Sequence, residues 1–365
     1  EKTRHFEDNA TADIVVSQPD ANLRATLRDG GDHYDMGVEE PGGILLRATK
    51  SPLRLSMFRD GVELWSEQEP LAKNRTATFQ TLAAAEGESF FGGGMQNGRW
   101  SHKGQKIRIS IDYNWADGGN PNAAPFYLST GGYGVYRNTW SPGYYDFTAS
   151  PSVLGHNESR FDAFYFAAAP RDFRGVLEGY TSLTGRPFMP PIYGLGLGDS
   201  DCYHDSRHGN DSYVAWAVAD KYNEQDMPDA WMLINDGYGC GFGVGPEKFP
   251  SNFTVLDEVV AGQKQRGFVT GLWSSTGLAN ISREVAGSGV RIAKTDVAWI
   301  GDGYRYAFKA VEQVAAGIED NSDARRFIWT VEGWAGTQRL AVMWTGDDTG
   351  SFEYIRWQIP TFIGC

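Results

Sequence analysis

The sequence predicts a two-part fold, an antiparallel β-sandwich over residues 1–184 followed by a (β/α)8 TIM-type barrel over residues 185–365. Up to about residue 170, short apolar strands alternate with turn signals, whereas beyond residue 193 apolar runs alternate with helical stretches. A proline-rich segment from Arg186 to Ile192 separates the two patterns. Because clustered prolines interrupt regular structure, this segment marks the predicted domain boundary.

The first part is predicted to be antiparallel because tight turns join its strands. Residues 53–58 and 62–65 flank Asp60-Gly61, a dipeptide that favours a two-residue hairpin loop. The glycine runs Gly92-Gly-Gly94 and Gly118-Gly119 are interpreted as turns. Further strands are predicted at residues 43–49, 77–83, 107–111, 126–129, 134–138 and 162–167, with a short helix over residues 170–183.

The second part is predicted to be a barrel of parallel strands joined by helices. Strands are expected at residues 194–198, 230–234, 268–273, 290–294, 326–330 and 340–344, and helices at residues 211–225, 254–266, 307–317 and 351–358. A doubly wound sheet is disfavoured because no Gly-X-Gly-X-X-Gly loop opens any of these helices. Since a full barrel takes about 250 residues, we expect the sequence to end within its barrel, with a seventh strand beginning at residues 360–363.

The composition disfavours two classes of partner. With 33 basic and 46 acidic residues the net charge is −13, which argues against binding to nucleic acid or to an acidic membrane surface. No apolar run of about 18 residues is present, so no membrane-spanning helix is predicted. The 12 Trp, 17 Tyr and 20 Phe suit stacking against flat ligands such as sugars, and ordinary cores use them equally. Nothing in the pattern predicts an oligomeric state.

Sequons predict a secreted glycoprotein. Asn-X-Ser/Thr occurs at six positions where chance gives roughly two, namely Asn9, Asn74, Asn157, Asn210, Asn252 and Asn280. The sequence starts at Glu1 without an apolar leader, as expected if a signal segment has been removed or if the record starts internally. Of the three cysteines, Cys202 and Cys240 either form a disulfide or are free thiols, and Cys365 is left over.

Two aspartates at predicted strand ends are candidates for catalysis. Asp296 closes the fourth predicted barrel strand and Asp347 closes the sixth. The carboxyl ends of barrel strands carry the active site, and retaining hydrolysis of an α-glycoside needs two carboxyl groups about 5–5.5 Å apart. The alternative interpretation is that each aspartate caps the helix that follows it.

Several motifs resemble glycoside hydrolase family 31 in the family's own order. They are Phe90-Phe-Gly-Gly-Gly-Met95, Ala124-Pro-Phe-Tyr-Leu-Ser129, Leu183-Thr-Gly-Arg-Pro187, and Gly333-Trp-Ala-Gly-Thr-Gln-Arg339 followed by Trp344-Thr-Gly-Asp347. The resemblance runs from about Arg54 to the last residue. It implies retaining exo-action on a terminal α-linked sugar, with Asp296 as nucleophile and Asp347 as acid/base. The substrate is then a carbohydrate or glycoconjugate, and the reaction needs no cofactor and no metal.

The resemblance extends to residues expected to bind the sugar. Asp236 and Asp117 match positions that touch sugar hydroxyls, although each also suits a turn beside a following glycine. The remaining predicted binding residues stand at or after strand ends: Asp199, Asp201, Tyr238, Trp273, Trp299, Val331, Glu332 and Trp344. For the tryptophans the alternative is core packing. His204 and His208 lie four apart after the first strand, where a solvated role is favoured over metal binding.

Two departures from the glucose-cleaving members bear on the sugar. Val297-Ala-Trp299 follows the nucleophile where those members read Met-Asn-Glu, and Val331-Glu332 replaces Arg-Ser. Loss of the guanidinium frees volume near the 2-position of the sugar, which favours an acetamido group there. The chain thereby resembles the α-N-acetylgalactosaminidase branch. The alternatives are an α-glucosidase, α-galactosidase or α-glucosyl transferase of the family, and a carbohydrate-binding member without turnover.

Overall fold

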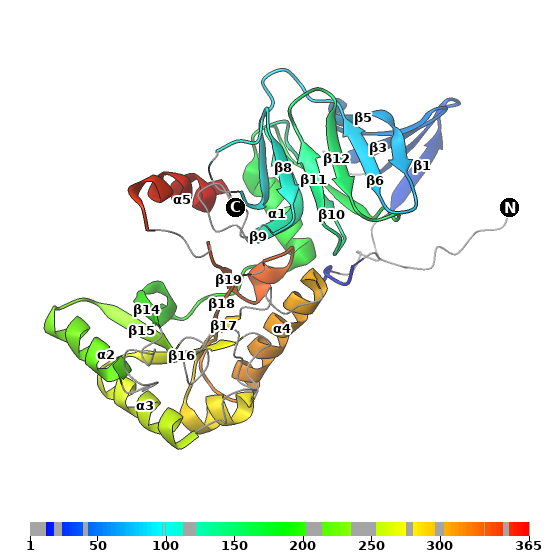
Figure 1. The fold of residues 1–365 in the computed structure, drawn as a ribbon. Coiled ribbons are helices and arrows are strands. Elements are labelled where there is room, and N and C mark those ends of the chain that lie inside the picture. The colour runs from blue at the N-terminus through cyan, green and yellow to red at the C-terminus, as the bar shows by residue number, and fades with distance from the viewer. Residues whose placement is uncertain are drawn as a thin grey trace. The chain divides into compact units, whose positions relative to one another are not determined.

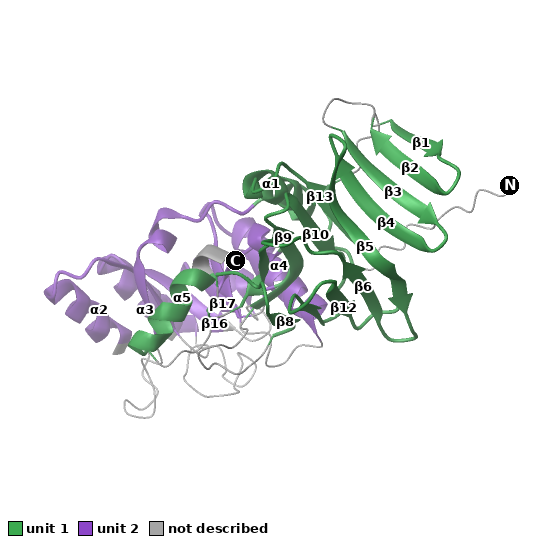
Figure 2. Ribbon diagram, turned by 90° about the horizontal axis from the view of Figure 1, so that it is seen from above, with its two compact units in different colours: residues 1–186, 334–336, 345–365 green, residues 187–333, 337–344 purple. Residues whose placement is uncertain are grey.

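The computed structural model describes residues 12–17, 24–38, 43–96, 98, 100–111, 122–201, 214–234, 253–274, 280–295, 303–331, 333–345 and 350–364. The chain divides into two compact units (Figure 2). Unit 1 comprises Glu1–Arg186, Trp334–Gly336 and Thr345–Cys365, and unit 2 comprises Pro187–Gly333 and Thr337–Trp344. None of the helices described is both long enough and apolar enough to cross a membrane.

Unit 1 contains two antiparallel sheets (Figure 1). The larger sheet has nine strands in the order β1 Ala25–Asp29, β2 His33–Val38, β3 Ile44–Lys50, β4 Leu53–Arg59, β5 Val62–Lys73, β6 Thr78–Leu82, β12 Ser152–His156, β11 Gly143–Asp146 and β8 Lys106–Ile109. The smaller has four, in the order β13 Ala163–Ala167, β10 Tyr133–Arg137, β9 Asn122–Ser129 and β7 Phe90–Met95. The predicted sandwich is confirmed.

Strand β9 shows how the layers of unit 1 pack, because its successive side chains point to opposite faces. Tyr127 meets Tyr145 of the large sheet, with ring centroids 5.4 Å apart. Phe126 stacks at 3.9 Å on Tyr180 of helix α1, Phe173–Thr184. The small sheet therefore lies between the large sheet and α1.

The hairpin around Asp60-Gly61 is confirmed. Arg59 pairs with Val62 across β4 and β5, which leaves a two-residue loop. Asp60 has φ 50° and Gly61 has φ 78°. Positive φ at both loop positions is the signature of a type I′ turn, whose twist matches that of the flanking strands.

The interpretation of Gly92-Gly-Gly94 as a turn is wrong, since these glycines lie within strand β7. All three have positive φ, and the β7–β9 register shifts between Gly92 and Gly94. A Cβ atom on Gly92 would lie 2.8 Å from the Phe126 carbonyl oxygen, and one on Gly94 would lie 2.6 Å from that of Asn122. Glycine is needed here because two backbones approach closely at a bulge.

Unit 2 contains six parallel strands with helices packed on one face, the predicted partial barrel (Figure 1). The strands run in sequence order: β14 Leu197–Asp201, β15 Asp229–Ile234, β16 Val269–Ser274, β17 Ile292–Thr295, β18 Phe327–Thr330 and β19 Val342–Met343. The helices are α2 Val214–Glu224, α3 Phe253–Gln265 and α4 Tyr304–Asp320, with short helices η1 Ile192–Leu195, η2 Arg283–Ser288 and η4 Thr337–Arg339. The barrel strands and helices predicted from the alternating pattern are thus present.

Two details of the barrel prediction are wrong. Residues 360–363 do not begin a strand, since they lie within helix α5, Phe352–Gly364, which belongs to unit 1 and includes Pro360. Strand β14 begins at Leu197 rather than at Gly194, because the short helix η1 occupies the residues before it.

The two faces of the parallel sheet bury different side chains. On the helix face, Ile234, Leu272, Ala293 and Ile328 pack against residues of α3 and α4. On the other face, strand side chains pack against one another in a cluster of Leu233, Trp273, Ile292 and Phe327 together with Tyr193, Trp231, Val269 and Trp329. We refer to this second face as the interior face.

Candidate active site

The predicted catalytic pair follows two strands of unit 2. Both Asp296 and Asp347 lie outside the described residues, as do Asp117, Asp236, Tyr238, Trp299 and Glu332. The strands before the pair are described: β17 ends at Thr295 and β19 at Met343. Each strand pairs in parallel with β18, so both end at the same edge of the sheet.

Backbone hydrogen bonds extend this edge by one residue on each side of β18. The Val331 amide donates to the Thr295 carbonyl at 3.2 Å, and the Trp344 amide donates to the Thr330 carbonyl at 2.9 Å. Neighbouring strands are spaced by about 4.8 Å, so β17 and β19 lie roughly 10 Å apart.

An aromatic cluster lines the interior face beside this edge. Trp231 of β15 lies 5.7 Å from Phe327 and 5.8 Å from Trp329 of β18, measured between ring centroids. Trp329 in turn lies 5.8 Å from Trp344 in an edge-to-face arrangement. Trp344 was predicted to line the site, whereas Trp231 and Trp329 were missed.

Lys294 reaches into this aromatic cluster from β17. Its side chain is only 6% exposed. The ammonium nitrogen lies 3.9 Å from the Trp344 ring centroid and 5.4 Å from that of Trp329. Aromatic faces stabilise a cation most strongly when both are removed from water. The structure therefore holds a positive charge at the interior face, two residues before Asp296 in the sequence.

Strand alternation accounts for the position of Lys294 once the face of Ile292 is known. Side chains at positions i, i+2 and i+4 of a strand share one face. Ile292 lies in the interior cluster, so alternation predicts the same face for position 294. A lysine at that position of a buried strand is unusual enough to mark a site.

Trp273 and Val331 are both buried. Trp273, at 3% exposure, belongs to the interior cluster with Leu233 and Ile292, which is the core packing weighed as its alternative. Val331 has no exposed surface. These two side chains contribute apolar packing next to the edge.

Asp199 is placed differently from the prediction that it binds substrate. Its carboxylate accepts a hydrogen bond of 2.9 Å from the hydroxyl of Tyr222 on helix α2. In the β14–β15 register Asp199 pairs with Met232, which packs against Ala215 and Ala219 of the same helix. The Asp199 carboxylate therefore lies on the helix face of the sheet. Only the backbone of Asp201 is described, and it pairs with Ile234.

Among the side chains that are described, no three His, Cys, Asp or Glu come together as metal ligands. The three cysteines, His204 and His208 all lie outside the described residues. The site as described is thus a strand edge with an aromatic wall and one buried lysine.

Two segments of the chain match models of known protein families. Residues 2–146 match the model of a glycosyl hydrolase 31 N-terminal galactose mutarotase-like domain, and residues 293–365 match that of a glycosyl hydrolases family 31 TIM-barrel domain. The chain is 28% identical over 196 residues to alpha-glucosidase 2 of Bacillus thermoamyloliquefaciens, a match that covers 50% of this chain and 23% of that protein. It is 24% identical over 179 residues to the isomaltosyltransferase of Sporosarcina globispora, covering 42% and 16% of the two.

Solved structures show the same fold at low identity. The GH31 dextranase of Flavobacterium johnsoniae, complexed with glucose, superposes with a TM-score of 0.79 at 17% identity. That match covers 95% of this chain and 53% of the dextranase chain. The cycloalternan-forming enzyme of Listeria monocytogenes, in complex with a pentasaccharide substrate, gives a TM-score of 0.75 at 13% identity over 92% and 42% of the two chains. This chain therefore spans about half or less of each of these four proteins.

Proposed function

The chain belongs to glycoside hydrolase family 31, since two domain models of that family together match more than half of it, and we propose that it carries the catalytic pair of a retaining, exo-acting α-glycosidase. The observation that carries this proposal is the common edge at which β17 and β19 end, one strand apart. Asp296 and Asp347 follow these two strands in the sequence, and this supports the proposal that they act on one glycosidic bond.

In the proposed reaction the two aspartates divide the work. The Asp296 carboxylate attacks the anomeric carbon while Asp347 gives its proton to the leaving oxygen, which forms a covalent glycosyl-enzyme intermediate. Asp347 then takes a proton from water as the water displaces Asp296. A negative charge on Asp296 keeps Asp347 protonated beforehand, because two close carboxylates disfavour a second ionisation.

For the sugar we propose terminal α-linked N-acetylgalactosamine. Val331 offers an apolar, fully buried side chain where glucose-cleaving relatives carry an arginine, and its volume suits an acetamido methyl better than a bare hydroxyl. The names of the relatives favour a second candidate, α-glucoside hydrolysis or glucosyl transfer. A carbohydrate-binding role without turnover is the third.

Chromogenic substrates separate these candidates. We expect the p-nitrophenyl α-N-acetylgalactosaminide to be hydrolysed at least tenfold faster than the α-glucoside and the α-xyloside, measured as kcat/KM. Asp296→Ala should reduce turnover by about a thousandfold or more, since removing a catalytic nucleophile has effects of that order. Proton NMR of the first-released sugar should show the α-anomer. A preference for the glucoside would instead support α-glucoside hydrolysis or glucosyl transfer. If no turnover depends on Asp296, the carbohydrate-binding role without turnover is the candidate that remains.

We also propose that the protein is glycosylated on secretion. Three sequon asparagines are described, Asn74, Asn157 and Asn280, and all three side chains are exposed. Exposure is what an attached glycan requires. Expression in a eukaryotic secretory host should give a protein whose mass falls on treatment with an N-glycosidase, and an unchanged mass would contradict the proposal.

A further inference from the structure

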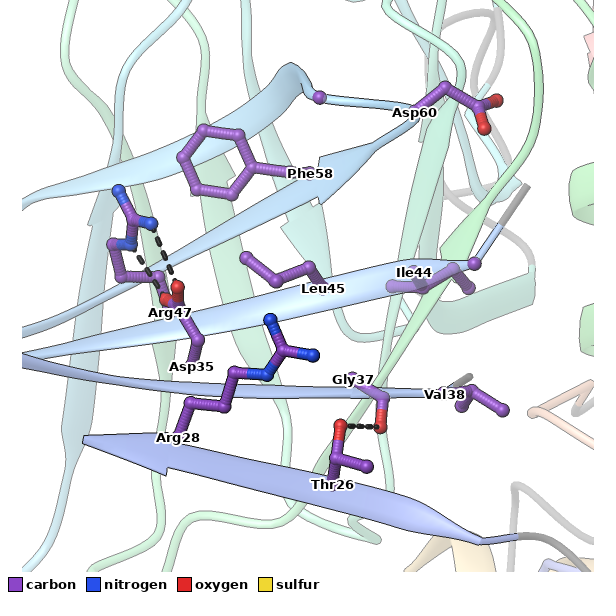
Figure 3. A pocket seen from close by; sticks show the side chains of 12 residues that line it. Thr26, Arg28, Asp35, Gly37, Val38, Ile44, Leu45, Arg47, Phe58 and Asp60 are labelled. Carbon is purple, nitrogen blue, oxygen red and sulfur yellow. Dashed lines mark hydrogen bonds and ion pairs between the residues drawn. The ribbon is translucent and has the colours of Figure 1, made fainter. Parts of the chain in front are cut away.

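The outer strands of the large sheet hold a cavity that the proposed catalytic site does not use. It has a volume of about 590 Å³ and is lined by residues of β1 to β4 and of the turn after β4 (Figure 3). All of it belongs to unit 1. A cavity of this size is in the range that accommodates a small ligand.

Strand register arranges the lining in two rows across the sheet. In the first row Arg28 pairs with Asp35, and Asp35 pairs with Arg47. In the second row Gly37 pairs with Leu45, and Leu45 pairs with Phe58. Residues directly opposite each other on neighbouring strands share a face. One row of the cavity is thus charged, and the adjacent row is apolar.

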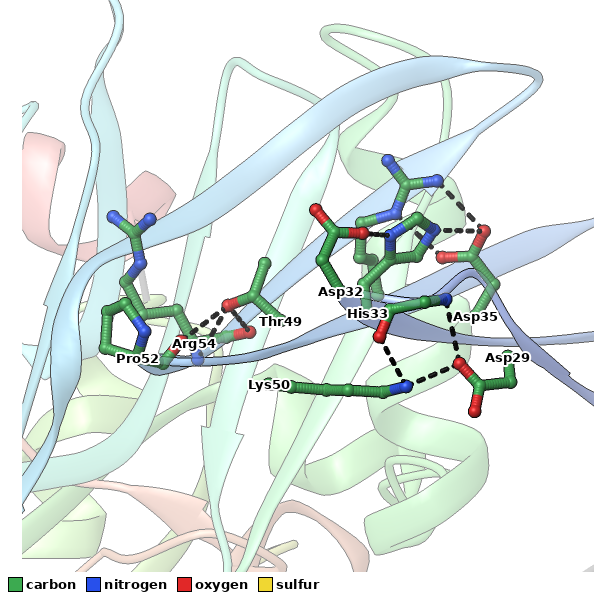
Figure 4. Close-up of polar contacts among 10 residues, drawn as sticks. Asp29, Asp32, His33, Asp35, Thr49, Lys50, Pro52 and Arg54 are labelled. Atoms are coloured by element: carbon green, nitrogen blue, oxygen red, sulfur yellow. Dashed lines mark hydrogen bonds and ion pairs between the residues drawn. The ribbon is translucent and has the colours of Figure 1, made fainter.

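The charged row is held in a fixed geometry. Arg47 donates two hydrogen bonds to Asp35, from Nε to Oδ1 at 2.7 Å and from Nη2 to Oδ2 at 2.9 Å. These bonds lower the pKa of the Asp35 carboxyl. His33 Nε2 lies 3.5 Å from Asp35 Oδ2 on the other side (Figure 4). This pair uses Arg47 Nε and Nη2 and leaves Nη1 out. The Nη1 donor and the Asp35 carboxylate are therefore held in fixed positions before any ligand binds.

Arg28 completes the charged row with an exposed guanidinium. It makes no hydrogen bond or ion pair with any residue that the structure describes, and Figure 3 shows it extending over the cavity between β1 and β3. Its five donors match the hydroxyl groups of a polar ligand.

The apolar row forms a hollow next to these donors. Gly37 has no side chain, and a Cβ built there would contact the Ile44 carbonyl oxygen at 3.4 Å and the Leu45 side chain at 3.9 Å. Leu45 forms the floor, and the half-buried ring of Phe58 stands at the end of the row (Figure 3). The Arg47 guanidinium carbon lies 5.2 Å from the Phe58 ring centroid, which ties the two rows together.

From this arrangement we propose that the cavity binds a neutral oligosaccharide, at a site separate from the catalytic edge. A sugar ring has an apolar face of C–H groups and a rim of hydroxyls, so it matches an apolar row beside a row of fixed donors and acceptors. The described lining carries two arginines and two aspartates, Asp35 and Asp60, so its charges balance. A balanced lining in a chain of net charge −13 favours an uncharged ligand over an acidic one.

The proposal is tested on an array of immobilised oligosaccharides, neutral and acidic, probed with the Asp296→Ala protein so that no glycan is cleaved. We expect retention on neutral glycans. Phe58→Ala and Arg28→Ala should each weaken binding about tenfold, and Gly37→Val should do the same by filling the hollow. Leu27→Ala is the matched control, because Leu27 neighbours Arg28 on β1, is 66% exposed and lies on the opposite face.

Three results would overturn the proposal: no neutral glycan retained, retention that Phe58→Ala and Gly37→Val leave unchanged, or retention of acidic glycans alone. Thermal unfolding of each variant shows whether it is folded, and Gly37→Val replaces Phe58→Ala if the latter is not. In the protein with Asp296 intact, Phe58→Ala should leave hydrolysis of the small chromogenic substrate unchanged. That readout keeps the failure of this site distinct from failure of the proposed catalysis.

Discussion

Among the residues that the structure describes, Arg137 in unit 1 and Lys294 in unit 2 are buried cations that lie against aromatic rings, and their surroundings differ. Arg137 of β10 is 1% exposed, lies 4.2 Å over the Phe161 ring, and donates to the Thr78 hydroxyl at 3.2 Å and the Asp162 carbonyl at 3.3 Å. Lys294 of β17 is 6% exposed and has its ammonium over Trp344 and Trp329. The Arg137 donors are directed at acceptors on neighbouring segments, whereas the Lys294 ammonium lies against aromatic faces.

The difference suggests a division of roles. A planar guanidinium whose donors are directed at a hydroxyl and a carbonyl stabilises one arrangement of the scaffold. An ammonium group against ring faces, two residues before the proposed nucleophile in the sequence, is instead expected to affect activity. Predictions that separate stability from activity sharpen this comparison.

The largest effect is expected at Arg137. Arg137→Met keeps the apolar stem but leaves the Thr78 hydroxyl and buried carbonyls without their donor, which should lower the free energy of unfolding by about 3 kcal/mol. Chemical denaturation measures this loss. Arg59→Met is the control, since Arg59 is half-buried and donates to the Ala167 carbonyl at 3.1 Å from the rim of the same unit. Equal losses of unfolding free energy in the two variants would show that Arg137 stabilises unit 1 no more than Arg59 does.

Lys294→Met should give the opposite pattern. A methionine still packs on the two indole rings, so stability should change by less than about 1 kcal/mol. We expect kcat/KM on the chromogenic substrate to fall about 10- to 100-fold, because a charge two residues before the proposed nucleophile in the sequence is lost. Lys309→Met on α4 is the matched control, with its side chain 47% exposed. A loss of stability with unchanged activity would make Lys294 a scaffold residue like Arg137.

Beside Arg137, the scaffold also holds a neutral histidine. His156 Nδ1 lies 3.0 Å from the Ser141 carbonyl and Nε2 3.2 Å from the Tyr145 hydroxyl. Burial, with the Arg137 charge adding to it, lowers the pKa of His156 to about 3. Since an unfolded histidine titrates near 6.5, the unfolded chain binds the proton more readily, and stability is lost as the pH falls from about 6.5 towards 3.

This predicts a pH dependence that one substitution removes. At pH 5 the His156 contribution to the free energy of unfolding should be lower by about 2 kcal/mol than at pH 7. His156→Gln keeps a polar side chain and has no proton to gain, so its stability should fall less steeply below pH 6.5. Denaturation of both proteins between pH 4 and 7 gives the two slopes, and parallel slopes would show that His156 is not the titrating group.

Much of the fold was predictable because its signals are local. The Asp60-Gly61 hairpin and the alternation of strands and helices after residue 193 depend on turn chemistry and periodicity within a few residues. Gly92 to Gly94 were wrongly interpreted as a turn. The need for glycine there comes from the close approach of β9, which lies more than 25 residues later in the sequence. Strands β1, β2, β11 and β12 were missed because polar residues interrupt their apolar alternation. Most of β1 is exposed, whereas Ser152 and His156 of β12 are polar but buried.

The site was less predictable, because which face a side chain occupies depends on where its strand begins. The sequence ended the first barrel strand at Gly198, which left Asp199 in a loop at the site. Strand β14 in fact runs from Leu197 to Asp201 and turns Asp199 to the helices. Lys294 was not predicted as a site residue, because the sequence does not show which face of its strand is the interior face. That face follows from the buried neighbours of Ile292, which only the structure identifies.

The smallest predicted effect tests the placement of Asp199. If its carboxylate belongs to the helix face, Tyr222→Phe removes one hydrogen bond and should lower the free energy of unfolding by about 1 kcal/mol, with kcat/KM unchanged. Asp199→Asn should lower stability less, because the amide oxygen still accepts from Tyr222, and should also leave kcat/KM unchanged. A double-mutant cycle of Tyr222→Phe with Asp199→Ala, in which each single variant removes the hydrogen bond, isolates the Tyr222–Asp199 coupling from other losses. A fall in kcat/KM for Asp199→Asn that Tyr222→Phe does not share would return Asp199 to the substrate site.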